Sequence, residues 1–323
     1  MKKQLLIAAV AATMGTAAMA DVSITGDAKF EYFNTETSTV STNKTNTEVN
    51  LGIKGKNGDT TVVANLEFNT HDAASNMDIE DLYMTTKVGD VTVKGGNYAT
   101  GTSAILGEIE NGGRASNKVT LSGSNGGVSW YLGNSGSVGE GAMQIDGNMF
   151  VGASMDVAGW KVQAKHNSAT VDSFGISGEV SGVGIRLEQK NDTAANGDTT
   201  FGNVTYSTNG IDLAYAWLDS DKANQIDEDD SAIFAVENGI VTATTDTGNA
   251  QITAKTSVAG NTVTVKSGSV ENGIATGTDL DYTQIAVSRP LASGATFAAT
   301  YTDKDDSATT DTQILELDLS VKF

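Results

Sequence analysis

Polar and apolar side chains alternate along most of this chain. Between Val22 and Phe33, apolar residues occupy the even-numbered positions, and mostly polar residues occupy the odd-numbered ones. The C-terminal segment from Leu315 to Phe323 repeats the alternation without interruption. Because successive side chains of a β-strand point to opposite faces, each such segment predicts a strand with one apolar and one polar face.

Sixteen segments show this alternation, counting the two at the chain ends. The others lie at 46–56, 60–69, 79–88, 90–97, 117–124, 126–134, 146–157, 159–167, 172–181, 182–190, 200–208, 210–218, 281–289 and 294–303. Links after even-numbered segments are tight, as at Asn57-Gly58 and Asn209-Gly210, where Asn and Gly tolerate the positive φ of short hairpin turns. Links after odd-numbered segments are mostly longer and polar. This contrast predicts an up-and-down antiparallel sheet with two distinct ends.

A sheet of this size is expected to close, because an open one would expose the hydrogen-bonding groups of its edge strands. A barrel of sixteen strands is too wide for side chains to fill and encloses an aqueous channel. Apolar side chains then face lipid, and polar ones face the lumen. We therefore predict an all-β, transmembrane, antiparallel up-and-down β-barrel of 16 strands. Strand-like stretches at Ile233 to Thr244 and Ile252 to Val265 leave 18 strands as the alternative.

The N-terminus carries the features of an export signal. Lys2 and Lys3 precede an apolar run from Leu5 to Ala12, and Ala18-Met19-Ala20 ends the segment. This order is typical of a cleaved secretory signal peptide. We predict a signal peptide at 1–20 and a barrel domain at 21–323.

Composition narrows the functional classes. Forty acidic residues against 20 basic ones argue against a nucleic-acid binder, because phosphate recognition relies on Lys and Arg. The absence of cysteine excludes disulfide scaffolds and thiol catalysis. The sequence contains no metalloprotease HExxH motif at His71 or His166, no P-loop at Gly55-Lys56 and no nucleophile elbow. We expect neither an enzyme nor a bound cofactor.

Three short stretches carry a family resemblance: Asp21 to Phe30, Gly89 to Gly95, and Leu315 to Phe323. On these stretches the chain resembles the general porins of the Gram-negative outer membrane, a family of trimeric 16-stranded barrels. The resemblance implies a homotrimer in outer-membrane lipid. It also implies that the barrel assembly machinery recognises the C-terminal Phe323.

The same resemblance implies that the third long loop, Tyr98 to Ser116, folds inward and narrows the pore. This loop carries Glu108, Glu110 and Arg114. One position departs from the family pattern, because Gly96 stands where many members carry an arginine.

Strand parity predicts that several charged side chains face the lumen. The basic ones are Lys29, Lys54, Lys94 and Arg186, and the acidic ones are Glu48, Glu67 and Glu188. Opposed charges in a constriction orient dipolar solutes and set ion preference. We expect these residues and the charged residues of the third loop to determine selectivity.

The segment 219–280 is expected to be a long acidic external loop or a hairpin insertion. With Asp281 it holds eleven acidic residues and three lysines. Its first acidic run fails the EF-hand pattern, because Asn224 stands at the position of the required glycine. A solvated loop is therefore favoured over a divalent-cation site here.

These observations predict a general diffusion porin, a water-filled channel for ions and small hydrophilic solutes. The acid excess predicts that the channel prefers cations. A substrate-selective outer-membrane channel is one alternative, and a secreted β-rich surface adhesin is an alternative of a different class.

Overall fold

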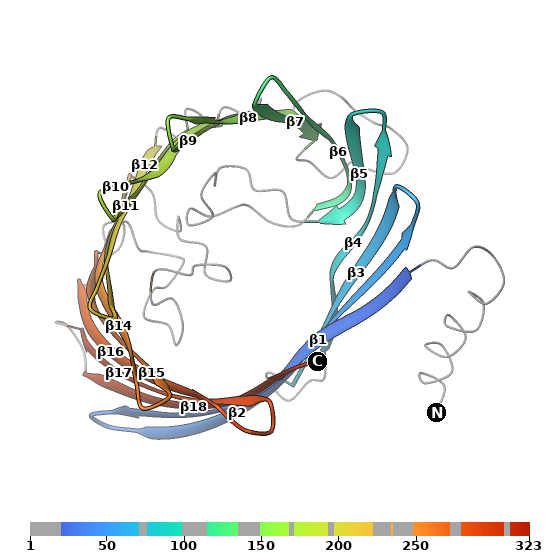
Figure 1. Cartoon of the computed structure of the whole chain (residues 1–323). Helices are drawn as coiled ribbons and strands as arrows, with labels where there is room; N and C mark the ends of the chain where they lie inside the picture. The colour runs from blue at the N-terminus through green and yellow to red at the C-terminus, as the bar shows by residue number, and fades with distance from the viewer. Residues whose placement is uncertain are drawn as a thin grey trace, which may run out of the picture.

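The computed structural model describes residues 21–70, 76–98, 115–134, 149–167, 171–192, 197–221, 234, 248–271, 279–306 and 311–323. These residues form 18 antiparallel strands in a single sheet. The first strand pairs with the second and also with the last, so the sheet closes into a barrel (Figure 1). The prediction of an all-β up-and-down barrel is confirmed.

The strands are β1 Asp21–Thr37, β2 Ser41–Asn57, β3 Thr60–Asn69, β4 Asn76–Val88, β5 Val91–Tyr98, β6 Ala115–Asn125, β7 Val128–Asn134, β8 Met149–Val157, β9 Trp160–Asn167, β10 Val171–Val180, β11 Val183–Asp192, β12 Gly197–Thr208, β13 Ile211–Ser220, β14 Gly248–Val258, β15 Asn261–Glu271, β16 Leu280–Pro290, β17 Ala295–Asp306 and β18 Thr312–Lys322. The predicted count of 16 was wrong, and the alternative count of 18 is confirmed for the described residues. Both extra strands overlap the stretch from Ile252 to Val265, whereas the stretch from Ile233 to Thr244 lies outside the described residues except for Phe234. The fold therefore differs from the 16-stranded architecture that the resemblance to general porins implied.

The two additional strands, β14 and β15, lie inside the segment that we expected to be a loop or insertion. They are wall strands, since β14 pairs with β13 and β15 pairs with β16. Small residues such as Ala250 and Ala254 occupy the outward positions of β14, and they weaken the apolar alternation. Surrounding acidic residues further obscured the pattern in the sequence.

Tight turns join the even-numbered strands to the next ones, as the parity of the links predicted. Ala158, Ser181, Asn209 and Ala259 have φ values between 50° and 53°, and a glycine with positive φ follows each. Two consecutive residues with positive φ match the type I′ turn, whose twist fits a two-residue hairpin. These turns lie at one rim of the barrel, while the longer links leave from the other rim.

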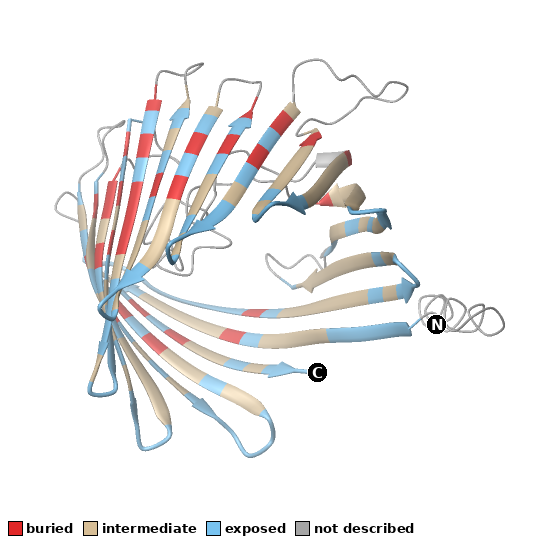
Figure 2. Cartoon of the chain, turned by 45° about the horizontal axis from the view of Figure 1, so that its top comes forward, coloured by how far each residue is buried: buried red, intermediate tan, exposed pale blue. Residues whose placement is uncertain are grey.

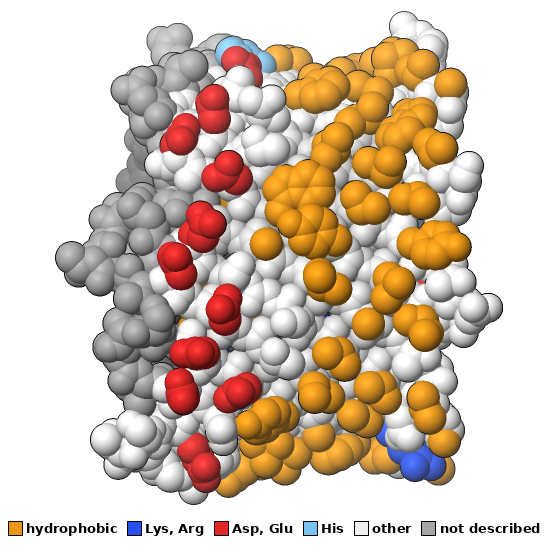
Figure 3. Space-filling view, turned by 90° about the vertical axis from the view of Figure 1, so that its left-hand side faces the viewer, with side chains coloured by type: hydrophobic (Ala, Val, Ile, Leu, Met, Phe, Trp, Pro, Cys, Tyr) orange, Lys and Arg blue, Asp and Glu red, His pale blue; other side chains and the backbone are white. Residues whose placement is uncertain are grey.

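The two faces of the wall have inverted polarity compared with a soluble protein. Ile24, Phe30 and Ile252 are 58%, 47% and 59% exposed, whereas polar side chains such as Gln251 and Thr302 are buried. Figure 2 shows buried positions alternating with exposed ones along many strands. The outer surface carries an apolar belt, with a row of Asp and Glu side chains along one edge of it (Figure 3). Such a surface suits a barrel surrounded by lipid.

Among the described residues, no helix has the length and apolar character needed to cross a membrane.

Candidate functional site

We give the name basic wall to five inward-facing cations on β5, β6, β9 and β11. They are Lys94 on β5, Lys118 on β6, Lys165 on β9, and Arg186 and Lys190 on β11. Neighbouring lysines of the basic wall lie close enough for their like charges to repel. Lys118 is repelled by Lys94, and Lys165 is repelled by Lys118 and Lys190. Glu188 lies among them and attracts Lys165.

Two tyrosine rings hold Lys94 within the basic wall, and we call this arrangement the aromatic clamp. The Lys94 Nζ atom lies 3.8 Å from the ring centroid of Tyr83 and 3.9 Å from that of Tyr98. The two rings meet edge to face, with centroids 5.8 Å apart. A hydrogen bond of 2.7 Å between the hydroxyls of Tyr98 and Thr120 fixes one ring. Cation–π attraction to both rings therefore positions the ammonium group.

Other cations of the basic wall also lie near aromatic rings. Lys165 Nζ lies 5.3 Å from the Phe150 ring centroid, and the guanidinium carbon of Arg186 lies 6.0 Å from that of Phe201. Ser173 lies between Lys165 and Lys190 in the strand register. Its buried hydroxyl has no hydrogen-bond partner among the residues that the structure describes. This part of the wall thus combines positive charge, apolar rings and a hydroxyl group.

Carboxylates predominate at mid-strand on the wall where the barrel closes, and we call them the acidic wall. They are Glu31, Glu48, Glu67, Asp81, Glu316 and Asp318, on β1 to β4 and β18. Four of them accept hydrogen bonds from asparagine side chains. The pairs are Asn46 to Glu31 at 2.8 Å, Asn50 to Glu48 at 2.7 Å, Asn69 to Glu67 at 2.6 Å and Asn65 to Asp81 at 2.8 Å.

The two walls create opposed charges across the lumen. In Figure 1, strands β18, β1 and β2 lie across the ring from strands β8 and β9. The walls approach each other at β4 and β5, where Asp81 attracts Lys94. A transverse field of this kind orients a solute that carries both charged and apolar parts.

The structure separates the basic residues that strand parity predicted. Lys94 and Arg186 belong to the basic wall, whereas Lys29 lies on the acidic wall and forms an ion pair with Glu31. Lys54 pairs with Ser23, is exposed, and lies close to the turn at Asn57.

The predicted acidic residues and the terminal aromatic fall in different places. Glu48 and Glu67 lie on the acidic wall, and Glu188 lies among the basic residues. Glu108, Glu110 and Arg114 lie outside the described residues, as does most of the third loop. Phe323 directly follows β18 on the outer face and is 59% exposed.

Sequence reasoning missed Lys118, Lys165 and Lys190. Each one occupies the polar face of a predicted strand, so strand parity could have identified all three. Their partners come from other strands, and the pairing of lysines with aromatic rings has no local signal in the chain.

Neither a family model nor a curated protein matches the chain. Solved structures from Pseudomonas aeruginosa are similar in fold. OccK11 (OpdR) has a TM-score of 0.66 and 14% identity, with 94% of this chain and 96% of that chain covered. OpdK with vanillate has a TM-score of 0.67 and 12% identity, with 94% of this chain and 98% of that chain covered. Another structure of the outer membrane protein OpdK has a TM-score of 0.63 and 11% identity, with 93% of this chain and 99% of that chain covered. These similarities establish that the chain shares the closed-barrel fold of these porin-like proteins.

Proposed function

We propose that this protein is a substrate-selective outer-membrane channel whose preferred solutes are small organic anions, with aromatic carboxylates as the best-matched class. The aromatic clamp at Lys94 is the observation that carries the proposal. Its ammonium group attracts a carboxylate, and the half-buried ring of Tyr83 offers an apolar surface to a ring-bearing solute, while the buried Tyr98 ring holds the ammonium group in place.

Further along the basic wall, Lys165, Ser173 and Lys190 offer a second place where a carboxylate can be bound. Several binding sites of moderate affinity favour permeation of the solute over its trapping, because a channel must release the solute that it binds. The structural relative OpdK was solved with vanillate, an aromatic carboxylate, which supports the same class of solute.

The outer-membrane location rests on two observations. The exposed outer face of the wall is apolar, and the closed sheet pairs its strands around the whole ring. Only closed barrels and helices satisfy their backbone groups within a bilayer. A secreted adhesin would expose such an apolar belt to water, which is unfavourable.

The cation preference expected from the acid excess is not supported by the described lumen. Many acidic residues lie on the outer face, such as Asp172 and Asp281, and others lie in the long links. Inside the barrel, the acidic wall is opposed by the basic wall, and Lys29 and Lys44 lie beside the acidic residues. The total charge of the chain is therefore a poor guide to the preference of the pore, and the selective channel is the better proposal.

The test is the current through single channels in a planar bilayer with vanillate or the neutral vanillyl alcohol added. We expect vanillate to block the current saturably and the alcohol to have little effect. Lys94→Gln should raise the half-blocking concentration roughly tenfold, because a hydrogen bond to a charged group contributes about 1.5–3 kcal/mol. Lys54→Gln, near the turn rim, serves as the control and should match the wild type. Equal behaviour of the two solutes would instead indicate a general diffusion pore.

A further inference from the structure

Two aromatic side chains on the lumen face of β7 and β8 each lie over a glycine of the other strand. Tyr131 stands directly opposite Gly152 in the strand register, and Phe150 stands directly opposite Gly133. A Cβ atom at Gly152 would overlap the Tyr131 ring, and one at Gly133 would lie 2.7 Å from Phe150 Cζ. The two ring centroids are 5.8 Å apart. We call this arrangement the glycine-backed shelf, because glycine allows each ring to approach the backbone of the neighbouring strand.

Lys165, on β9, brings a positive charge to the glycine-backed shelf. Its Nζ atom lies 5.3 Å from the ring centroid of Phe150. Phe150 is 3% exposed, whereas Tyr131 is half-buried. Phe150 therefore positions the ammonium group, and Tyr131 offers ring surface to the lumen. The aromatic clamp has the same construction, with the buried ring of Tyr98 and the half-buried ring of Tyr83.

The glycine-backed shelf adjoins the aromatic clamp in the wall. Thr120, on β6, shares the 2.7 Å hydrogen bond with the hydroxyl of Tyr98, and it pairs with Gly133 on β7. A Cβ atom at Gly133 would lie 2.9 Å from Thr120 Oγ1, so Thr120 lies between the two arrangements. The clamp and the shelf are thus neighbours on one wall, and each has its own lysine.

The charges near Lys165 favour an anion at the glycine-backed shelf. Glu188 attracts Lys165, whereas Lys118 and Lys190 repel it. Together with Lys165 itself, three cations therefore lie near one carboxylate. A local excess of positive charge raises the concentration of anions at this part of the lumen.

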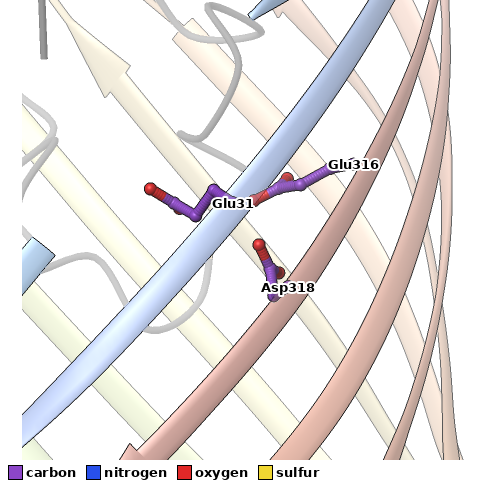
Figure 4. Close-up of side chains that lie close together, drawn as sticks. All are labelled: Glu31, Glu316 and Asp318. Carbon is purple, nitrogen blue, oxygen red and sulfur yellow. The ribbon is translucent and has the colours of Figure 1, made fainter. Parts of the chain in front are cut away.

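Carboxylates of the acidic wall lie on the other side of the lumen. Glu31, Glu316 and Asp318 gather at the junction of β1 and β18 (Figure 4). These two strands lie across the ring from β8 and β9 (Figure 1). Negative charge on that side directs a solute carboxylate towards Lys165, and the ring of the solute can then contact Tyr131.

We propose that Tyr131, Phe150 and Lys165 form a second binding site for an aromatic carboxylate, next to the aromatic clamp, and that a solute occupies the two sites in turn. Lys165 binds the carboxylate, and Tyr131 contacts the ring. This inference rests on the proposed function and adds the residues that select ring-bearing solutes beyond the clamp. Two adjoining sites of moderate affinity suit a channel, because a solute released from one can bind at the other.

The test compares the block of single-channel currents by benzoate and by cyclohexanecarboxylate, which has the same charge and ring size but no aromatic ring. We expect benzoate to block the wild type at the lower concentration. Tyr131→Leu should raise the half-blocking concentration of benzoate about threefold to tenfold and that of cyclohexanecarboxylate less, because an aromatic pair contributes beyond its buried area. Tyr131→Phe keeps the ring and should behave as the wild type.

Glycine variants test whether the shelf depends on its backing. Gly152→Ala should displace the ring of Tyr131 and weaken the block by benzoate, as Tyr131→Leu does. Gly55→Ala is the matched control, because a Cβ there meets nothing within 4 Å. Tyr131→Leu adds no atoms to the wall, so it still decides the question if Gly152→Ala fails to fold.

Combination with Lys94→Gln separates the two sites. The double variant with Tyr131→Leu should have a higher half-blocking concentration of benzoate than Lys94→Gln alone. Equal values for these two variants would overturn the inference, as would an unchanged value for Tyr131→Leu by itself. In either case, a wild-type block that depends on Lys94 would leave the proposed function standing. A wild-type channel that neither vanillate nor benzoate blocks would instead contradict the proposed function.

Discussion

Gly26 and Phe323 close the barrel through a reciprocal pair of backbone hydrogen bonds. The amide of each residue donates to the carbonyl of the other, and both distances are 2.9 Å. The ring of Phe323 lies so close to Gly26 that a Cβ atom built there would lie 2.9 Å from the ring atom Cζ. The C-terminal residue is thus both part of the seam and an exposed aromatic group on the outer face.

Replacing Gly26 with alanine is expected to destabilise the barrel. The added Cβ would lie 2.4 Å from the carbonyl oxygen of Asn50, and backbone at that position cannot move without disturbing β2. Overpacking of this kind costs about 1–3 kcal/mol, which a urea titration of the refolded protein would measure. Gly55→Ala is the matched control, because a Cβ there meets nothing within 4 Å. Equal stability of the two variants would contradict the close approach seen at Gly26.

Substitution of Phe323 by alanine is expected to separate assembly in cells from folding in detergent. The variant retains the backbone hydrogen bonds to Gly26, so refolding into micelles should stay close to wild type. If the assembly machinery recognises the aromatic side chain, the amount in the outer-membrane fraction should fall several-fold. Phe323→Tyr should restore it. Normal assembly of the alanine variant would refute a role of this ring as the signal.

Single cysteines test whether β14 is a strand of the wall. The chain contains no cysteine, so each introduced thiol is unique. Ile252→Cys should react poorly with a water-soluble maleimide, because Ile252 lies on the exposed apolar face. Thr253→Cys should react readily, because Thr253 faces the lumen beside Gln251. In an external loop both thiols would react at similar rates, and that outcome would argue against the 18-stranded wall.

The aromatic clamp predicts different effects for two substitutions of Tyr98. Tyr98→Phe loses the hydrogen bond to Thr120 but keeps the ring over Lys94. Tyr98→Leu removes the ring as well, and a cation–π contact contributes about 0.5–2 kcal/mol. Leucine should therefore raise the half-blocking concentration of vanillate several-fold, while phenylalanine should have a smaller effect. Single-channel current records provide the measurement, and identical values for both variants would exclude a role for the ring.

Much of the wall follows from local sequence. The alternation from Val22 to Phe33 predicts both a strand and the faces of its side chains, because the period of two is a property of the extended backbone itself. Tight turns such as Asn209-Gly210 are equally local, since they depend on residues that tolerate positive φ. These features are sufficient to predict an up-and-down barrel, its two rims and the inward direction of Lys94.

Tertiary structure decided what these local patterns leave open. The sequence by itself determined which side chains face inward, but only the closed register brought Glu31 beside Glu316, because those residues lie at opposite ends of the chain. Pairing with β13 and β16 likewise made β14 and β15 part of the wall despite their weak alternation. Lys94 acquired its aromatic clamp from β4 and from the end of its own strand. Charge patterns and binding sites of a barrel arise from neighbours in the sheet, and that neighbourhood exists only after the strands have paired.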